Sequence, residues 1–434
     1  MSELVMKYQQ YAEYKDSGVE WLGEIPKNWE VVRLKYIAEL SGNKVSGSEN
    51  QYVGLENVES KTGKFKVTEG IVSEGVSNTF EKDNLLFGKL RPYLAKSWLA
   101  SFSGICSSEF LVLNSQLVHP KFLKYMTLTD EFVEQVNSST YGSKMPRASW
   151  DFIGLLQLPV MDYGVSETIA NFLDHETAQI DTLIEKQQTL IQLLKEKRQA
   201  VISHAVTKGL NPDALMKDSG VEWLGEVPEH WTVKRLKYIS PKVGVGLVIN
   251  PSTYTQDEGV YFIFGGDVKE FSFDLTKTRR ISQKNSDILK SSQLHHRDLV
   301  SIRVGYPGVT AVVTEELEGA NCASIIIIRR GQFNSDWLCA AMNIWVGKQQ
   351  VNNASYGAAQ KQFNVSDAIE FIFPVPPESE QNDIAVYVEE SLKKFDELSN
   401  KAQLQIELLR ERRTALISAA VTGKIDVRGW RVPD

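Results

Sequence analysis

A few polar segments of the chain combine basic, amide and aromatic side chains. The first half holds GKLRPYLAK (88–96) and TYGSKMPRAS (140–149), and the second half holds an Arg-Arg pair (279–280), SIRVGYPG (301–308) and SYGAAQKQFN (355–364). Arg and Lys suit the N7 and O6 acceptors of guanine, while Gln and Asn suit N6 and N7 of adenine. The candidate nucleic-acid contacts are Lys89, Arg91, Tyr93, Lys96, Tyr141, Ser143, Lys144, Arg147, Arg279, Arg280, Arg303, Tyr306, Gln360, Lys361, Gln362 and Asn364.

The sequence leaves open which of these residues would read bases and which would hold phosphates, because that division depends on geometry. The Arg279-Arg280 pair favours phosphate. For any single member of the set, a solvated surface side chain is the alternative.

Signatures of catalysis are missing from the sequence. It has no Asn-Pro-Pro-aromatic or Asp-Pro-Pro-aromatic box for amino-methyl transfer, no GxxxxGK[ST] motif, and no Gly-rich phosphate loop. Residues 59–61 (ESK) and 267–269 (DVK) match only the end of a nuclease acid-x-Lys pattern, a match that arises often by chance. His295 and His296 lack a third ligand at metal spacing. We therefore predict a chain without catalytic residues or a metal site.

The composition is that of an ordinary globular chain, with 434 residues, 42% hydrophobic, 24% charged and a net charge of −7. The length suggests two or three domains. No stretch approaches the roughly 18 apolar residues of a membrane span, so a cytoplasmic location is expected. The three cysteines, Cys106, Cys322 and Cys339, form no CxxC pair, which favours reduced, buried thiols over disulfides or a zinc site.

The overall acidity, taken alone, argues against nucleic-acid binding. Residues 40–155 carry 12 Lys and Arg against 12 Asp and Glu, and residues 240–370 carry 13 against 13. Neutral segments bind DNA poorly by counterion release unless their charges are sorted onto one face. We therefore predict that the isolated chain binds DNA weakly and that partner proteins supply much of the phosphate contact.

Two blocks of the sequence occur twice. KDSGVEWLGEIPKNWEVVRLKYIA (15–38) and KDSGVEWLGEVPEHWTVKRLKYIS (217–240), here termed the first and second repeat boxes, are identical at 18 of 24 positions. LLKEKRQAVISHAVTKG (193–209) matches LLRERRTALISAAVTGK (408–424), and Pro159-Val160 matches Pro374-Val375 at the same offset of 215. The chain is therefore a duplicated unit of repeat box, variable block, Pro-Val exit and long helix.

Each of the two variable blocks is predicted to fold into a mixed α/β domain, here termed a head. SEFLVL (108–113) and CASIIII (322–328) are apolar runs that favour buried strands, although a buried helix segment gives the same pattern. HPKFLKYMTLTDEFVEQV (119–136) and SDWLCAAMNIWVGKQQV (335–351) have helical spacing. Each head should therefore place a helix or two just before its Tyr-Gly loop.

Heptad patterns follow each head. Alternate steps of four and three from Ile169 give a seam that includes Leu183 and Leu190, and the same steps from Ile384 include Leu398. Each pattern predicts a continuous helix of about 40 residues, roughly 60 Å long, with the two helices paired. Ordinary packing within one globular core is the alternative. Antiparallel pairing would relate the halves by a pseudo-two-fold axis, the symmetry that half-sites about 34 Å apart offer on DNA.

The repeated blocks resemble those of a known family. GVEWLGEIPKNWEVVRLKYI and GVEWLGEVPEHWTVKRLKYI, each ahead of a variable block, and the two helical blocks are similar to the specificity (S) subunits of type I restriction-modification enzymes. The resemblance covers nearly the whole chain and is most specific in the helical blocks. It implies a mixed α/β fold with two target recognition domains joined by two long helices in a pseudo-two-fold symmetric, antiparallel coiled coil. The implied segments are recognition domain 1 (1–160), central spacer helix (161–212), recognition domain 2 (213–375), and C-terminal spacer helix with tail (376–434).

The resemblance also implies a function. Such a subunit reads a bipartite, asymmetric target in double-stranded DNA, and its paired helices set the spacing between the half-sites. It docks two methyltransferase subunits, and restriction subunits join them. Adenine methylation and ATP-driven cleavage, with S-adenosylmethionine, ATP and Mg, belong to those partners, so the chain itself is expected to hold no cofactor. The loops after Tyr141-Gly142 and Tyr356-Gly357 would face the DNA.

The repeat boxes have two compatible interpretations. Trp21, Leu22, Pro26 and Trp29 fit core packing where a head joins the helices. Core packing does not explain why exposed-type polar residues are also identical in both boxes, so we predict a docking surface for two copies of one partner. The candidate docking residues are Glu20, Trp21, Glu24, Lys35, Glu222, Trp223, Glu226 and Lys237.

Two other functions stay open on residues alone. A coiled-coil structural adaptor with two divergent protein-binding heads fits the neutral charge of the heads. An enzyme fused to its own DNA readers is disfavoured by the missing motifs. Footprinting separates these possibilities, because only a sequence reader should protect two short, unlike sequences around an unread gap.

Overall fold

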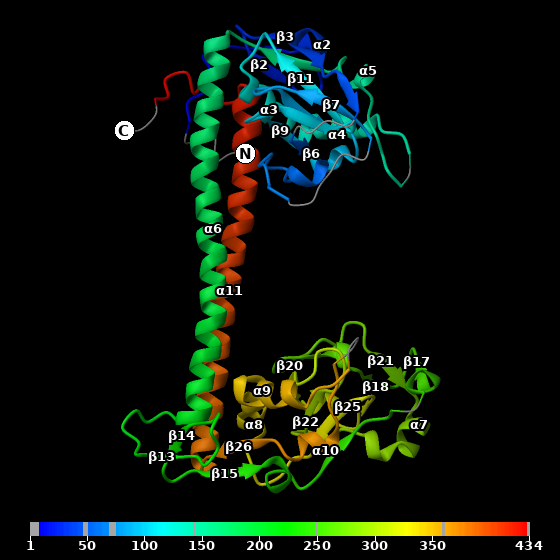
Figure 1. Ribbon diagram of the computed structural model, residues 1–434, viewed down its shortest axis with the longest axis vertical. Helices are drawn as coiled ribbons and strands as arrows, with labels where there is room; N and C mark the ends of the chain where they lie inside the picture. The colour runs from blue at the N-terminus through cyan, green and yellow to red at the C-terminus, as the bar shows by residue number, and fades with distance from the viewer. Residues whose placement is uncertain are drawn as a thin grey trace. The chain divides into compact units, whose positions relative to one another are not determined.

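Two long helices, α6 (Tyr163–Lys208) and α11 (Glu378–Val421), run through the chain. The computed structural model describes residues 8–46, 51–68, 75–142, 144–248, 250–357 and 361–431. Its contacts divide the chain into unit 1, Met1–Gln188 with Gln403–Asp434, and unit 2, Thr189–Ala402. Each unit therefore contains part of each long helix together with its own head (Figure 1).

The head of unit 1 is built on two four-stranded sheets with the orders β4-β11-β8-β9 and β5-β7-β10-β6. The predicted strand in SEFLVL is confirmed as β11, and the predicted helical segment forms two helices, α3 and α4. Thr129 separates them because its side chain accepts a hydrogen bond from Phe132 N and caps α4. The elements are α2 (Leu34–Ile37), β4 (Ala38–Ser41), β5 (Lys44–Ser46), β6 (Tyr52–Val53), β7 (Val76–Phe80), β8 (Leu85–Gly88), β9 (Ser97–Leu99), β10 (Gly104–Ser107), β11 (Phe110–Ser115), α3 (Pro120–Thr127), α4 (Asp130–Ser138) and α5 (Trp150–Ile153).

The head of unit 2 repeats this plan with the sheet orders β16-β25-β22-β23 and β17-β21-β18-β24. The run CASIIII contains β25, and the second predicted helical segment forms α8 and α9. The elements are β16 (Val243–Val245), β17 (Thr255–Gln256), β18 (Val260–Ile263), β19 (Val268–Lys269), β20 (Ser272–Phe273), β21 (Arg279–Ile281), α7 (Gln283–Ile288), β22 (Leu299–Ile302), β23 (Thr310–Val312), β24 (Asn321–Cys322), β25 (Ile325–Ile328), α8 (Ser335–Asn343), α9 (Trp345–Ala354) and α10 (Val365–Ala368).

Strands β11 and β25 explain why two apolar runs lack alternation. Leu111 and Leu113 of β11 belong to one core cluster, whereas Phe110 and Val112 belong to another. In β25 the four isoleucines divide between two clusters in the same way. A strand buried on both faces has apolar residues at every position, so the unbroken apolar pattern identifies the central strand of each head.

Each repeat box pairs with the strand that contains the Pro-Val dipeptide of its own half, Pro159-Val160 or Pro374-Val375. Strand β3 (Glu30–Arg33) pairs antiparallel with β12 (Gln157–Val160), and β15 (Thr232–Arg235) pairs with β26 (Ile372–Val375). Before them lie the hairpins β1 (Tyr14–Asp16) with β2 (Glu24–Pro26), and β13 (Met216–Asp218) with β14 (Glu226–Pro228). The repeated residues thus form the base on which each head stands.

Each repeat box also packs on the C-terminal end of a long helix. In unit 1, Lys424 Nζ donates to Glu24 O at 2.5 Å, and a Cβ on Gly423 would lie 2.4 Å from Pro26 Cδ. In unit 2, Lys208 Nζ donates to Glu226 O, and Gly209 has φ +79°. The glycine that ends each helix is therefore required, since φ is positive at both and a side chain at Gly423 would overlap the box. The predicted packing of the boxes against the helices is confirmed within each unit.

The halves of α6 and α11 pair antiparallel within each unit. In unit 1, Asp181 Oδ1 lies 3.2 Å from Arg413 Nε, and in unit 2, Arg198 Nη1 lies 3.4 Å from Asp396 Oδ1. These two ion pairs are equivalent under the 215-residue offset. Asp181 also holds the head, because Lys64 Nζ lies 2.9 Å from its Oδ2. The mixed α/β fold with paired antiparallel helices matches the expectation.

The predicted seam of the helix pair is wrong at alternate positions. Leu183 and Leu190 are 45% and 43% exposed, whereas the neighbouring Ile184 and Ile191 are half-buried. On α11, Leu398 is likewise exposed. On α6, the sequence allows either of two adjacent residues to face the partner helix, because Leu183 and Leu190 are each followed by an isoleucine. The ion pairs at 181–413 and 198–396 lie on the seam that forms.

Among the helices formed by the described residues, none contains an apolar stretch that would span a bilayer.

Candidate nucleic-acid interface

The structure joins the two polar segments of unit 1 into one surface, here termed loop pair 1 (88–96 with 140–149). Arg91 N donates to Pro146 O at 2.8 Å, and Ala148 N donates to Lys89 O at 3.0 Å. The second segment closes on itself, since Tyr141 and Arg147 exchange backbone hydrogen bonds of 3.1 and 3.0 Å. Ser143, a predicted contact, lies outside the described residues.

Unit 2 contains an equivalent surface, here termed loop pair 2 (301–308 with 355–364). Gly305 N donates to Lys361 O at 3.1 Å, and Phe363 N donates to Arg303 O at 3.3 Å. Tyr356 and Gln362 exchange two backbone hydrogen bonds of 2.9 Å, as Tyr141 and Arg147 do. Gln360 lies outside the described residues. The hydrogen-bonded backbone of each loop pair, here termed its platform, is thus duplicated, although few of the side chains on it are repeated.

Glycine makes the turn at the Tyr-Gly step of each platform. Gly142 has φ +90° and Gly357 has φ +106°, a region that residues with a Cβ rarely adopt. The repeated Tyr-Gly dipeptide therefore marks the turn that carries the exposed residues. This dipeptide is the local sequence feature that predicts where the two loops lie.

Loop pair 1 divides its cations between structural and exposed roles. Arg147 donates from Nε and Nη2 to the Glu109 carboxylate at 3.1 to 3.2 Å, and this bonding raises the pKa of its guanidinium. Lys96 points into the head and donates to Leu55 O at 2.5 Å, and burial lowers the pKa of its ammonium. Arg91 and Lys144 are exposed. These two cations, with Tyr93 and Tyr141, are available to an external partner, and half-buried Lys89 lies at the junction of the loops.

Loop pair 2 has the same division. Arg303 donates to Phe363 O at 3.3 Å and to Asn364 Oδ1 at 3.2 Å, and Asn364 Nδ2 donates to Tyr356 Oη at 2.9 Å. These three side chains hold the two segments together. Tyr306, 81% exposed, and Lys361 project outward, while Gln362 is half-buried.

Arg279 and Arg280 lie apart from loop pair 2 in the fold. Both belong to β21 in the sheet β17-β21-β18-β24, whereas the loop pair follows β22 in the other sheet. The Arg279 guanidinium lies 4.9 Å from the Phe264 ring centre, and that of Arg280 lies 4.0 Å from the Tyr261 ring centre. Both cations are held over aromatic rings.

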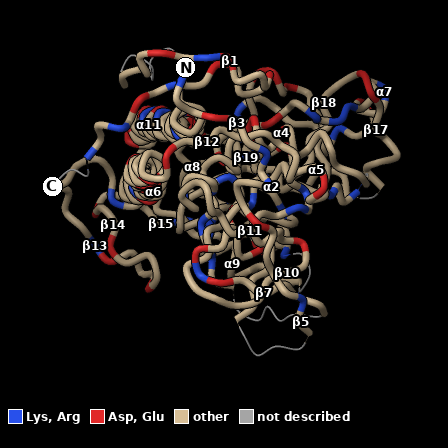
Figure 2. The backbone as a smooth tube through the Cα atoms, turned by 90° about the horizontal axis from the view of Figure 1, so that it is seen from above, with Lys and Arg blue, Asp and Glu red and all other residues tan. Residues whose placement is uncertain are grey.

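Two residues of these surfaces, Tyr356 and Glu109, are not among the contacts predicted from the sequence. Tyr356, 46% exposed, is the equivalent of Tyr141 at the 215-residue offset, so the repeat itself could have added it. Glu109, which engages Arg147, precedes β11 and carries no local signal for that contact. Acidic and basic residues are interspersed along the rest of the backbone, as Figure 2 shows.

Most of the predicted polar docking residues are exposed, and one is ion-paired within the chain. Glu20, Glu24 and Lys35 of the first box are exposed, as are Glu222 and Glu226 of the second. Lys237 Nζ instead lies 2.5 Å from Glu370 Oε1. These polar positions, apart from Lys237, face solvent although they are identical in the two boxes.

The two tryptophans among the predicted docking residues, Trp21 and Trp223, are half-buried. Trp21 lines a groove of about 620 Å³ in unit 1 together with Glu131 of α4 and with Thr414 and Ser418 of α11. Trp223 meets the Trp345 ring edge-on at 5.8 Å. Trp21 therefore offers a partly apolar surface beside the helix end.

The predicted core cysteines are confirmed as buried. Cys106 lies on β10 and Cys322 on β24, and burial raises the pKa of each thiol to about 12. Cys339 is buried in α8. Within the described ranges, no group of three or more His, Cys, Asp and Glu side chains could hold a metal ion.

Comparison with known proteins finds no matching family model. The chain is 22% identical over 218 residues to the type I restriction enzyme EcoDI specificity subunit of Escherichia coli, a match covering 47% of this chain and 49% of that protein. It is 24% identical over 314 residues to the EcoBI specificity subunit of Escherichia coli, covering 69% and 65%. These matches span less than two thirds of each relative. A third, to the putative MjaX specificity subunit of Methanocaldococcus jannaschii, is 24% identical over 451 residues and covers 98% and 100%.

Solved structures share the fold. A chain from a study of complex assembly and conformational transition of the type I R-M system superposes with a TM-score of 0.72 at 17% identity, covering 92% of this chain and 98% of that one. The HsdS subunit of Thermoanaerobacter tengcongensis superposes with a TM-score of 0.56 at 17% identity over the same shares. With its duplicated boxes, two α/β heads and antiparallel helix pairs, the chain is similar to type I restriction enzyme specificity subunits in sequence and shares the fold of these solved structures.

Proposed function

We propose that this chain is the non-catalytic DNA-recognition subunit of a type I restriction-modification complex. Loop pair 1 contacts one part of a two-part, asymmetric DNA target, and loop pair 2 contacts the other. The observation that carries the proposal is the duplicated platform, whose backbone hydrogen bonds match while its exposed side chains differ. A shared platform with unlike side chains suits a reader of two unlike half-sites.

Side-chain chemistry supports a division of labour in each platform. Arg147, Arg303 and Asn364 are engaged with neighbouring groups and act as positioning residues. Arg91, Lys144 and Lys361 are exposed cations suited to base edges or phosphates. Tyr93, Tyr141 and Tyr306 add exposed planar rings and hydroxyls. Arg279 and Arg280, on a separate sheet, are proposed phosphate contacts.

Partners supply the chemistry of the complex. Two methyltransferase subunits dock on the repeat boxes, where the exposed residues Glu20, Glu24, Glu222 and Glu226 are duplicated. Restriction subunits complete the nuclease. S-adenosylmethionine, ATP and Mg are bound by those subunits.

A head exchange tests the proposal. Residues 40–155 are replaced by the corresponding block of another specificity subunit, and the assembled complex is footprinted on random-sequence DNA. We expect one half-site to change while the other half-site and the gap stay the same. A footprint that changes on both sides, or protection without sequence preference, would contradict the assignment of one half-site to each head.

A further inference from the structure

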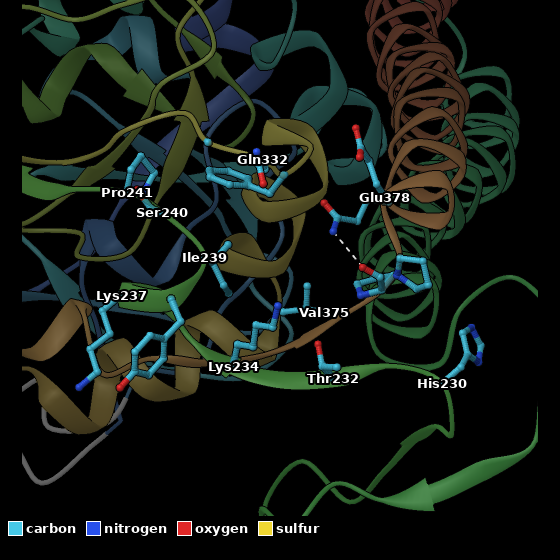
Figure 3. Close-up of a pocket in the computed structure, with 16 residues that line it drawn as sticks. His230, Thr232, Lys234, Lys237, Ile239, Ser240, Pro241, Gln332, Val375 and Glu378 are labelled. Carbon is cyan, nitrogen blue, oxygen red and sulfur yellow. Dashed lines mark hydrogen bonds between the residues drawn. The ribbon is translucent and has the colours of Figure 1, made fainter.

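A pocket of about 690 Å³ lies in unit 2 beside the second repeat box (Figure 3). Thr232 and Lys234 of β15 form one wall, Phe333 forms another, and Glu378 with Gln381 at the start of α11 forms a third. Its volume is within the roughly 300–1,000 Å³ of ligand-binding pockets. All lining residues belong to unit 2.

The differences between the two repeat boxes are concentrated at this pocket. Seven residues of the second box line it, and four of them, His230, Thr232, Lys234 and Ser240, differ from the first box. Of the other seventeen positions of the box, only two differ. The second box has therefore changed mainly where it forms the pocket.

Drift at exposed positions does not explain this distribution. Asp218, Glu222, Glu226 and Arg235 are exposed and lie outside the pocket lining, yet each is identical to its counterpart in the first box. Among exposed positions outside the lining, Glu229 differs from its counterpart, Lys27, so exposure alone accounts for few of the changes in this segment. What the four changed residues have in common is that they line the pocket.

The changes give the pocket a more positive wall. Thr232 stands where the first box has Glu30, which removes a carboxylate, and Lys234 stands where it has Val32, which adds an ammonium. Among the described residues, no carboxylate lies within ion-pair distance of Lys234, whereas Lys237 lies 2.5 Å from Glu370. His230 is likewise held by Glu380 at 2.5 Å. Lys234 is the lining cation that an incoming carboxylate could pair with.

The remaining walls favour a protein segment over DNA. Ile239, Phe333, Val375 and the Pro376-Pro377 pair supply apolar surface, and Glu378 places a carboxylate on the wall opposite β15 (Figure 3). A phosphate backbone carries a charge at every step and would meet that carboxylate. A peptide can place one acid against Lys234 and an apolar side chain on the other wall.

We propose that this pocket receives a segment of a partner protein in which an acidic residue neighbours an apolar one. The first repeat box, with Glu30 and Val32, does not bind that segment. The inference rests on the proposed function, because the partner is a subunit of the same complex. The two docking surfaces are therefore unequal although most of their residues are the same.

The test exchanges two strand residues that differ between the boxes, in the full-length chain. T232E combined with K234V gives the second box the residues of the first, which already form the paired strand β3, so folding should be preserved. E30T combined with V32K is the reciprocal change. Stepwise binding of the methyltransferase subunit is measured by native mass spectrometry and by titration at two salt concentrations. We expect the first double variant to weaken one binding step about tenfold and to remove part of its salt dependence.

A photo-crosslinking residue in place of Phe333, in the assembled complex, identifies the occupant. A crosslink to a partner segment with adjacent acidic and apolar residues supports the proposal. A crosslink to DNA, a crosslink to a segment without an acid, or no crosslink overturns it, as does unchanged binding by the T232E/K234V variant. The two-part footprint of the same complex is recorded in parallel, so that failure of the pocket and failure of the DNA-reading role are distinguished.

Discussion

Single residues of the loop pairs separate into those that hold the platform and those that face outward. Arg147 is bound to Glu109 through two nitrogens, and Arg303 reaches a backbone carbonyl and the Asn364 amide. Lys144 and Lys361, in the equivalent segments, are exposed. All four are basic residues in similar loops, so their sequence did not distinguish these roles.

Removing an outward cation should weaken DNA binding without affecting the fold. For K144A and K361A in the assembled complex, we expect the slope of log affinity against log salt to fall by about 1 each, because one phosphate-neutralising charge is lost. The melting temperature should not change. K186A, at an exposed position of α6, is the matched control. An equal loss of slope in the control would show that the effect is one of net charge.

Removing an inward cation should have the opposite profile. For R147A we expect a lower melting temperature, since Glu109 loses a bidentate partner beside the platform. R147K, which keeps the charge but not the fork, should recover the protein only partly. A variant that keeps full thermal stability while losing DNA affinity would place Arg147 at the DNA instead.

At the scale of elements, the duplicated ion pairs of the helices are not equally buried. The side chains of Arg413 and Asp181 are 10% and 15% exposed, whereas Asp396 is 58% exposed. Asp181 additionally meets Lys64 of the unit 1 head. The unit 1 pair therefore links both helices to the head in a partly desolvated site.

Breaking the unit 1 pair should destabilise the protein more than breaking its duplicate. We expect D181N to lower the free energy of unfolding of unit 1 by on the order of 2 kcal/mol, because the Arg413 charge is left buried without a carboxylate. R198M in unit 2 should cost under about 1 kcal/mol, since its partner is largely solvated. Denaturant unfolding with probes in each unit measures both. The double variant D181L/R413M should recover most of the loss, and failure to recover would mean that the pair itself is required.

At the scale of the whole molecule, the proposed function predicts that the two long helices set the distance between half-sites. Residues 187–193 of α6 lie between Asp181 and Arg198, and residues 401–407 of α11 lie between Asp396 and Arg413. Deleting both stretches removes one heptad from each helix and keeps the seam. At 1.5 Å per residue the pair shortens by roughly 10 Å, about three base pairs, so we expect the unread gap to contract by that amount. Footprints of the complex measure the gap, and an unchanged gap would refute the role of the helices as a ruler.

Charge distribution over the whole chain predicts how the complex shares DNA binding. The chain has a net charge of −7, and its heads are neutral. We expect the isolated chain to bind DNA weakly and the complex to show both higher affinity and a steeper salt slope. Indistinguishable titrations of chain and complex would contradict this prediction.

The sequence by itself determined the duplication, the mixed α/β class, the two long helices and the segments that form the loop pairs. These features follow from local patterns, since apolar runs, heptads and Tyr-Gly turns act over a few residues. Only the tertiary structure decided that residues 88–96 meet 140–149, that Glu109 engages Arg147, and that Lys96 points inward. It also decided which of the adjacent residues Leu183 and Ile184 faces the partner helix. Contacts of this kind join residues tens of positions apart, and their geometry depends on packing of the whole unit, which no local pattern contains.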